Sequence, residues 1–357
     1  MKGIWWKALG VVILLYVFWA GMLTPIKPGI VEVQAENAQA GQMLSVQLRG
    51  YNTHFAQTDE NRVWLVQGSE VVLPAKQVQA ADANTLNLQF ALPPYLPGVA
   101  KREEFRLLVD NPIDGRFVSE QSVAITQDSV SQEIGAALWS ESSITGLHER
   151  EGMAFPYLAQ LKETIRNLYF HVSLWFAMTI LFVTAMIFSI RYLRFFREDD
   201  DRKAKAFTTV GLLFGVLGIV TGAIWAKNTW GDYWSWDPKQ NMTAIALLIY
   251  FAYFVLRSAF EDMEKRARLA AVYNIFAFAT LIPLTYILPR MADSLHPGAE
   301  GNPGLASQDL DNTMRMIFYP AIIGWTLIGL WVAQLIYRSD RLRAKLLDDV
   351  SDKMIDV

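Results

Sequence analysis

Long apolar stretches occupy the first 23 residues of the chain and most of its second half. Six of them are long enough to cross a bilayer as helices, which takes about 20 residues each. They are Trp5–Leu23, Leu168–Ile190, Phe207–Ala226, Met242–Leu256, Leu269–Leu288 and Met316–Tyr337. The pattern predicts a mostly α-helical fold, a bundle of six transmembrane helices, with residues 1–23 as the first helix and 161–337 as a domain of five.

Basic residues are distributed unevenly between the connections. Lys and Arg are concentrated in 191–205, 257–268 and 338–345, whereas the alternate connections have few for their length. Cytoplasmic loops carry this excess of positive charge. The sequence therefore predicts a multi-pass protein of the cytoplasmic (inner) membrane with both termini cytoplasmic and 338–357 as a cytoplasmic tail.

The first apolar stretch also has an alternative interpretation as a cleaved secretory signal, because a basic start precedes it. The stretch Trp19-Ala20-Gly21-Met22 is a poor cleavage site of small residues, which favours an uncleaved anchor. Cleavage would leave five spans, and the later loops would still face the same sides.

A polar segment of domain size, 24–160, separates the first two spans. Apolar and polar residues alternate over Met43–Leu48 and Thr85–Phe90, as in half-buried strands. Further strand candidates are Arg62–Val66, Glu70–Leu73, Phe105–Val109 and Ser122–Ile125, and turns are expected at Pro93-Pro94, Pro97-Gly98 and 111–115. We expect a β-rich, sandwich-like periplasmic insert between helices 1 and 2, with a helical pattern from Pro156 onward.

Composition and motif content exclude several classes of site and partner. The 357 residues are 52% hydrophobic and carry a formal net charge of −3, which gives no indication of a nucleic-acid partner. Cysteine is absent, which excludes disulfides, thiolate metal sites and a Cys nucleophile on this chain. The sequence also lacks a Walker A loop, a Ser-His-Asp grouping and a metalloprotease helix motif.

One connection is unusually aromatic. The segment 230–238 reads Trp-Gly-Asp-Tyr-Trp-Ser-Trp-Asp-Pro, which predicts a large, rigid apolar surface followed by a turn back into the membrane. Such a surface suits a porphyrin, a wide aromatic plate. A membrane-interface aromatic belt is the alternative, because Trp and Tyr gather at interfaces without any ligand.

The positions of the histidines favour the first interpretation. The chain has four, His54, His148, His171 and His296. His171 lies at the outer end of the second span and His296 in the connection between the fifth and sixth, so both fall on the face of the Trp-rich connection. Two neutral imidazoles are a common axial pair for heme iron. His54 and His148 lie in the insert and are most simply surface residues.

Three basic residues flank the same connections, Lys227, Lys239 and Arg290. They could pair with heme propionates. Taken singly, each of them is explained more simply by interfacial anchoring through snorkelling.

With these residues in place, the chain resembles the CcmC branch of the cytochrome c assembly family with its tryptophan-rich WWD motif. The resemblance rests on 221–237, on the His-Val-Ser-Leu-Trp context of His171, on the Leu-His-Pro-Gly context of His296 and on Pro283. It covers 171–337 and, by topology, the first span, but not the insert. It implies non-covalently bound heme b with His171 and His296 as axial ligands of the iron. It also implies a heme-binding WWD loop, 226–240, and the cofactor-binding set is Trp225, Trp230, Gly231, Tyr233, Trp234, Trp236, Asp237, Lys227, Lys239 and Arg290.

The family implies a transfer component rather than an enzyme. Heme would be held at the periplasmic face and passed to the heme chaperone CcmE, with help from an ABC-type complex of CcmA, CcmB and CcmD. The stretch Trp-Ser-Trp-Asp-Pro-Lys at 234–239 also resembles the sister CcsA branch, the heme–apocytochrome c synthases. A synthase is therefore the enzymatic alternative, and a permease for another hydrophobic cargo is the third.

Overall fold

The computed structural model describes residues 3–36, 38–68, 70–140, 144–296 and 310–355, with side chains in the last range as far as 346. The chain forms two compact units. One comprises Met1–Thr24 with Glu163–Val357, and the other Pro25–Lys162.

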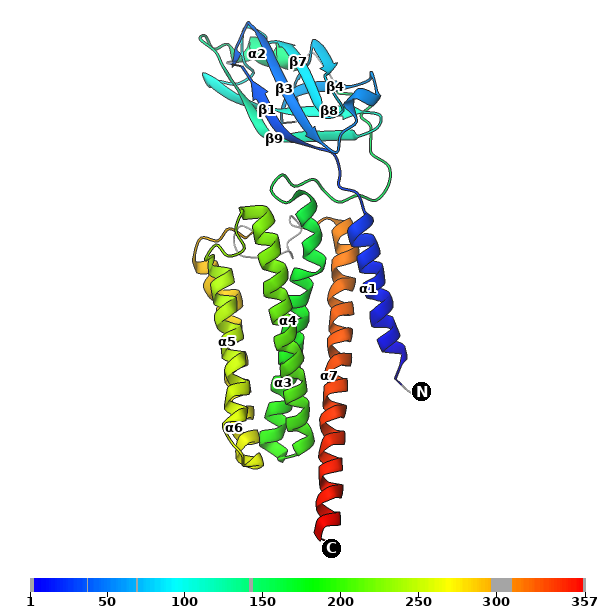
Figure 1. Ribbon diagram of the computed structural model, residues 1–357. Helices are drawn as coiled ribbons and strands as arrows, with labels where there is room; N and C mark the ends of the chain where they lie inside the picture. The colour runs from blue at the N-terminus through cyan, green and yellow to red at the C-terminus, as the bar shows by residue number, and fades with distance from the viewer. Residues whose placement is uncertain (1–2, 37, 69, 141–143, 297–309, 356–357) are drawn as a thin grey trace. The chain divides into compact units, whose positions relative to one another are not determined.

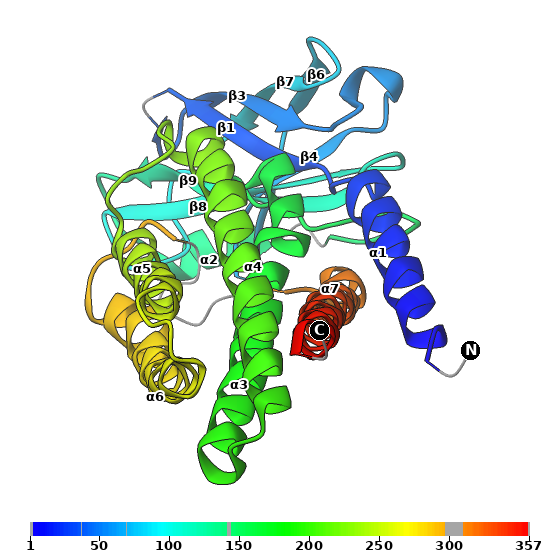
Figure 2. The ribbon, with the colours of Figure 1, turned by 60° about the horizontal axis from the view of Figure 1, so that its bottom comes forward.

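The first unit is helical (Figure 1). Its elements are α1 (Trp5–Leu23), a 3-10 segment η2 (Lys162–Tyr169), α3 (His171–Phe195), α4 (Glu198–Trp230), α5 (Pro238–Ser258), α6 (Met263–Ile282), a π-helical segment η3 (Pro283–Ile287), a 3-10 segment η4 (Leu288–Met291) and α7 (Asn312–Ile355). Seen from one end, α3 and α4 lie side by side at the centre, with α5 and α6 to one side and α7 and α1 to the other (Figure 2).

Six helical stretches in the described part of the chain are long and apolar enough to cross a membrane, and each expected span lies within one of them. The ends differ most at the carboxyl terminus, because α7 continues to Ile355 instead of ending at Tyr337. The helical pattern expected from Pro156 begins only at Lys162, after Phe155 forms a β-bridge to Ile26.

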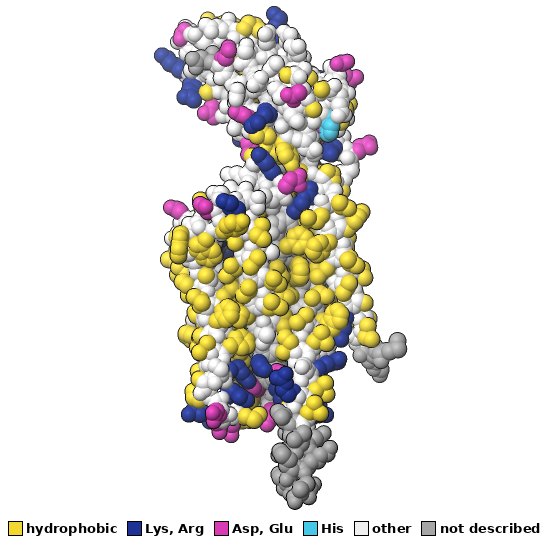
Figure 3. Space-filling view, in the orientation of Figure 1, with side chains coloured by type: hydrophobic (Ala, Val, Ile, Leu, Met, Phe, Trp, Pro, Cys, Tyr) yellow, Lys and Arg dark blue, Asp and Glu magenta, His cyan; other side chains and the backbone are white. Residues whose placement is uncertain are grey.

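Apolar side chains cover the face of the helical unit seen in Figure 3, and Lys and Arg gather at one end of it. That end contains the α3–α4 and α5–α6 connections, so it is the end that the basic residues define in the sequence. Arg257 of α5 forms a two-bonded ion pair there with Asp201 of α4, at 2.6 and 2.8 Å, both largely buried. The Trp-rich connection and His171 lie at the opposite end.

The second unit is a β-sandwich. A four-stranded sheet has the order β1-β3-β7-β6 and a five-stranded sheet the order β2-β9-β8-β4-β5. The strands are β1 (Gly29–Ala35), β2 (Ala38–Gln39), β3 (Met43–Tyr51), β4 (Arg62–Gln67), β5 (Val71–Pro74), β6 (Gln77–Ala80), β7 (Thr85–Ala91), β8 (Arg102–Asn111) and β9 (Gly115–Thr126). A 3-10 turn η1 (Phe55–Gln57) and a helix α2 (Gln132–Ser140) complete it.

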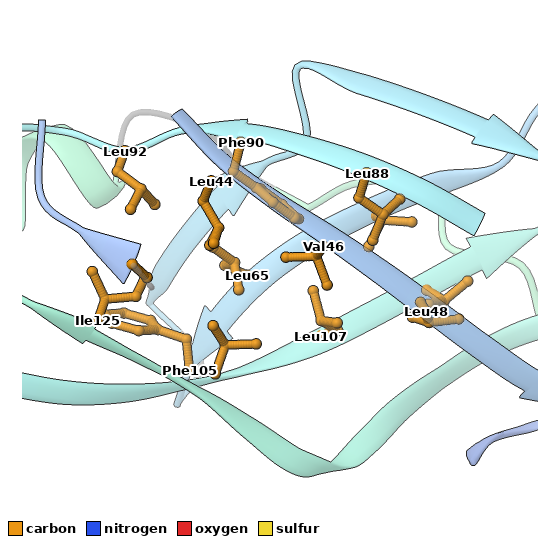
Figure 4. Close-up of a cluster of buried hydrophobic side chains, with 14 of the residues drawn as sticks. Leu44, Val46, Leu48, Leu65, Leu88, Phe90, Leu92, Phe105, Leu107 and Ile125 are labelled. Carbon is orange, nitrogen blue, oxygen red and sulfur yellow. The ribbon is translucent and has the colours of Figure 1, made fainter. Parts of the chain in front are cut away.

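Alternation along the strands builds the sandwich core. Leu44, Val46 and Leu48 of β3 face Leu65, Phe105 and Leu107 of the other sheet, all buried (Figure 4). The β-rich, sandwich-like fold expected from the sequence is confirmed. Strands β1, β2 and β6 and helix α2 were not expected, because short or partly exposed elements give weak periodic signals.

Candidate functional site

The end of α4 and the start of α5 define the connection that carries the aromatic motif. α4 continues to Trp230 and ends at Gly231, whose φ of 94° lies in the left-handed region that favours glycine. α5 begins with Asp237 as its N-cap and Pro238 in its first turn. The connection proper is therefore 231–237, and Trp225 and Trp230 project from a rigid helix.

Asp237 is a fully buried carboxylate surrounded by donors. It accepts hydrogen bonds from the backbone N–H of Lys239 (2.8 Å) and of Leu295 (2.7 Å) and from the Ser294 hydroxyl (2.9 Å). Its Oδ1 also lies 2.8 Å from Nδ1 of His296. Burial by itself would raise the pKa of this carboxyl, but the bonds from His296 and the backbone outweigh it and hold the pKa below its ordinary value. Asp237 is therefore an anion that ties the start of α5 to the segment before α7.

The ring of His296 lies among aromatic side chains at the end of α4. Its centroid is 4.9 Å from that of Trp230, with the planes at 75°, and 6.0 Å from that of Trp225, with the planes at 32°. The His296 side chain remains 21% exposed. The carboxylate on one edge and the two indoles around it fix the orientation of this imidazole. Pro297 and Gly298, which the resemblance also used, lie outside the described residues.

His171 is the first residue of α3 and packs directly against α4. Its Nδ1 lies 2.9 Å from the carbonyl oxygen of Gly218 and 3.3 Å from the hydroxyl of Thr221. A Cβ at Gly222 would lie 2.5 Å from Cε1 of His171, so only glycine lets α4 approach the ring this closely. The indole N–H of Trp175, one turn further along α3, donates to Nε2 of His171 at 3.3 Å.

These partners indicate that Nδ1 is the donor nitrogen in both rings. The ionised Asp237 carboxylate and the Gly218 carbonyl can only accept, so Nδ1 of each imidazole carries the hydrogen. An imidazole with its single hydrogen on Nδ1 has its lone pair on Nε2, the nitrogen that a metal would bind.

The remaining aromatic residues of the motif point elsewhere. Tyr233 is 59% exposed and Trp236 is 77% exposed, while Trp234 is half-buried. Trp236 has a φ of 58°, a strained conformation for this residue type, and the Asn241 side chain donates to its carbonyl oxygen.

The sequence suggested one flat surface of indole rings, but the structure has two separate sets of aromatic side chains. Trp225 and Trp230 pack edge to face, at 78°, because both belong to the last two turns of α4. Tyr233 and Trp236 lie on the exposed connection. The inner pair contacts His296, and the outer pair presents apolar surface.

The three basic candidates have different surroundings. Lys227 donates to the carbonyl oxygen of Gly231 at 2.6 Å and lies over the ring of Tyr233, so it caps the carboxyl end of α4. Lys239 is half-buried within electrostatic range of Asp237 and Arg290. Lys239 and Arg290 thus form a positive pair beside the buried carboxylate.

The two histidines of the sandwich belong to the other unit. His54 lies 2.7 Å from Asp114, and His148 lies 2.9 Å from Asp110, both carboxylates being buried. Asp110 is also paired with Arg62. No cluster of three or more acidic, His or Cys side chains suited to a metal ion is found in the described ranges. These contacts fasten loops to the end of strand β8.

Trp175 and Ser294 take part in this site but were not predicted from the sequence. Trp175 follows His171 by four residues, a spacing that places two side chains on one face of a helix, and that signal could have identified it. Ser294 has no comparable signal, because its contact with Asp237 joins residues 57 positions apart.

Comparisons with known proteins match most of this helical unit and the last part of the sandwich unit. The family model described as "Heme exporter protein C" matches residues 131–350, more than half of the chain. The chain is 27% identical over 200 residues to the "Heme exporter protein C" of Haemophilus influenzae, covering 54% of this chain and 78% of that protein. It is 25% identical over 194 residues to that of Rhodobacter capsulatus, with the same coverage of 54% and 78%.

A second group of relatives matches a shorter stretch at higher identity. The "Cytochrome c biogenesis protein CcsA" of Synechococcus sp. (strain CC9605) is 44% identical over 82 residues. That stretch is 23% of this chain, and this chain spans only 27% of the length of that relative.

Proposed function

Since the chain belongs to the heme exporter protein C family, we propose that it binds heme b without a covalent bond and hands it on during cytochrome c biogenesis. The resemblance indicated by the sequence is thereby confirmed at the level of the family. Heme is the cargo of this protein. The chemistry that the residues supply is coordination and release, and no bond of the porphyrin is made or broken.

One observation carries the proposal. The imidazole of His296 is oriented by a buried carboxylate and two indoles, and in both His296 and His171 Nδ1 contacts an acceptor oxygen, so Nε2 is the nitrogen that a metal would bind. Such an arrangement suits a flat iron macrocycle, since Trp225 and Trp230 offer aromatic edges and faces beside the ligand. Lys239 and Arg290 supply positive charge for the propionates.

Topology supports a site on the periplasmic side. The end of the helical unit that holds His171, His296 and the 231–237 connection is opposite to the end that carries the clustered Lys and Arg. Under the positive-inside rule the basic end is cytoplasmic. The 25–162 sandwich would then also be periplasmic, because it joins α1 to α3 at the end away from the basic residues.

The partners follow from this role. We propose that the heme chaperone CcmE receives the heme and that the ABC-type complex of CcmA and CcmB, with CcmD, assists its release. Exposed Tyr233 and Trp236 offer apolar surface on the connection that would face such an acceptor. A histidine of the acceptor could replace one of the two axial histidines, so transfer would be a ligand exchange.

Hemin loading of the purified chain in detergent tests the proposal. We expect a low-spin Soret spectrum for the wild type, and a change to a five-coordinate or weakened spectrum for His171→Ala and for His296→Ala. Matched controls are His54→Ala and His148→Ala, whose rings pair with sandwich carboxylates. A wild type that binds no hemin would favour a permease for another cargo, and unchanged spectra in the double variant of His171 and His296 would remove both as ligands.

The synthase remains a second candidate because of the 44% identity with CcsA over 82 residues. A synthase would join heme to a Cys-x-x-Cys-His apocytochrome through thioether bonds without a chaperone. Coexpression with an apocytochrome in cells that lack CcmE separates the two. Covalent cytochrome in those cells would establish the synthase, and its appearance only when CcmE is restored would establish the delivery role.

A further inference from the structure

The two proposed axial histidines are held in different ways. His296 donates its Nδ1–H to a buried, ionised carboxylate, Asp237. His171 donates its Nδ1–H to an uncharged backbone carbonyl, that of Gly218. A carboxylate partner makes an imidazole a stronger electron donor to a metal than a neutral partner does. The stronger ligand of the pair is therefore His296.

A second difference concerns the lone pairs that would bind iron. Nε2 of His171 accepts the indole N–H of Trp175 at 3.3 Å, with the two rings nearly perpendicular at 85°. An indole nitrogen is a donor only, so this bond uses the same lone pair that iron requires. No hydrogen bond reaches Nε2 of His296 from the residues that the structure describes.

Packing holds Trp175 in this position. Its ring packs against Gly218 of α4, where an added Cβ would lie 2.8 Å from two of the indole carbons. Gly218 thus supports both members of the pair, since its carbonyl oxygen binds His171 and its missing side chain makes room for Trp175. Freeing Nε2 of His171 breaks one hydrogen bond between two side chains of α3, whereas releasing His296 would disturb the several bonds around Asp237.

We propose that His171 is the exchangeable axial position of the heme site, and that the Trp175 indole N–H is a latch that competes with iron for Nε2 of His171. When the latch closes, the iron loses one axial ligand and is open to a ligand from an acceptor. When it opens, His171 completes the coordination. The inference rests on the proposed heme site and adds the order in which the ligands leave.

The test removes the indole N–H and keeps an aromatic ring, as Trp175→Phe. Trp325→Phe is the matched control, because Trp325 also lies in a membrane helix and its N–H donates to a backbone carbonyl, that of Tyr169, and not to a histidine ring. Each purified protein is loaded with hemin, and two quantities are measured. They are the fraction of six-coordinate low-spin iron and the rate of hemin transfer to an excess of apomyoglobin.

We expect Trp175→Phe to raise the six-coordinate fraction and to slow hemin transfer by about two- to tenfold. This is the change in rate expected when one neutral hydrogen bond is lost. Trp325→Phe should leave both quantities at the wild-type level. Faster transfer from Trp175→Phe, or equal changes in the two variants, would mean that Trp175 only packs, and the latch would be rejected.

A direct measurement on the wild type tests the latch without relying on the folding of a variant. The ultraviolet resonance Raman band that reports indole hydrogen bonding should shift toward the free N–H position when hemin is added. A band that stays in place while hemin binds would overturn the latch but leave the heme site intact. Failure of the wild type to bind hemin would instead refute the proposed function itself.

Discussion

At the scale of single residues, the role of Asp237 is the clearest gain from the structure. In the sequence it is the acid at the end of the aromatic motif and the first signal of a turn. In the fold it is a buried anion whose oxygens accept from the backbone of α5, from Ser294 and from His296. The aromatic motif and the histidine 59 residues later are thus one unit, held together by a single carboxylate.

Replacing Asp237 with Asn should weaken hemin binding about 10- to 100-fold, because an amide cannot supply the charge that orients and polarises His296. The midpoint potential of the bound heme should rise in parallel, since a less electron-rich imidazole stabilises ferric iron less well. Asp232→Asn is the control, because Asp232 is exposed in the same connection. Hemin titration and redox titration measure the two effects, and identical behaviour of the two variants would contradict this role.

At the scale of elements, the close contact of α3 and α4 determines where His171 lies. The ring has no room for a side chain between itself and α4 at Gly222, and Gly211 of the same helix is equally close to Phe182 further along the interface. Both glycines let the helices approach, as small residues do in membrane bundles. Only Gly222 borders His171, the proposed heme ligand.

Gly222→Ala and Gly211→Ala therefore form a matched pair. Each adds one methyl group to a full interface and should lower the free energy of unfolding by about 1–3 kcal/mol. Only Gly222→Ala should also displace His171 and reduce the six-coordinate fraction of bound hemin. Denaturant titration and absorption spectra separate the two effects, and a spectral change of the same size in Gly211→Ala would show that general loosening of the helices explains it.

At the scale of the whole molecule, the residues of the proposed site all belong to the helical unit. The sandwich has its own core, and its histidines are engaged with its own carboxylates. The guanidinium of Arg166, just before α3, donates to the carbonyl oxygens of Gly21 and Thr24 at 2.8 Å, so the two chain segments that enter the sandwich begin close together. A short linker can span that gap.

A chain in which 25–162 is replaced by a short Gly/Ser linker should therefore keep the hemin spectrum of the wild type. Its hemin affinity should stay within about threefold, because no residue of the proposed site is removed and distant sites act nearly independently. Hemin titration of the purified variant measures this, with helix content by circular dichroism as the control for folding. Loss of the spectrum from a fully helical variant would show that the sandwich takes part in heme binding.

The sequence by itself determined the six apolar helices, the basic end of the bundle and the β-rich insert. These follow from local patterns, since 20 apolar residues, clustered Lys and Arg, and a two-residue alternation can each be read without knowing what lies next to them. The same holds for the family, because the aromatic motif is a continuous stretch.

Only the tertiary structure decided how the site is assembled. The bond from His296 to Asp237 and the approach of His171 to Gly218 join segments 59 and 47 positions apart, and no local pattern encodes such distances. The division of the aromatic residues into an inner and an outer set likewise depends on α4 continuing to Trp230. The sequence gives the type of each side chain. The neighbours that occupy or leave free a lone pair are known only once the helices are packed.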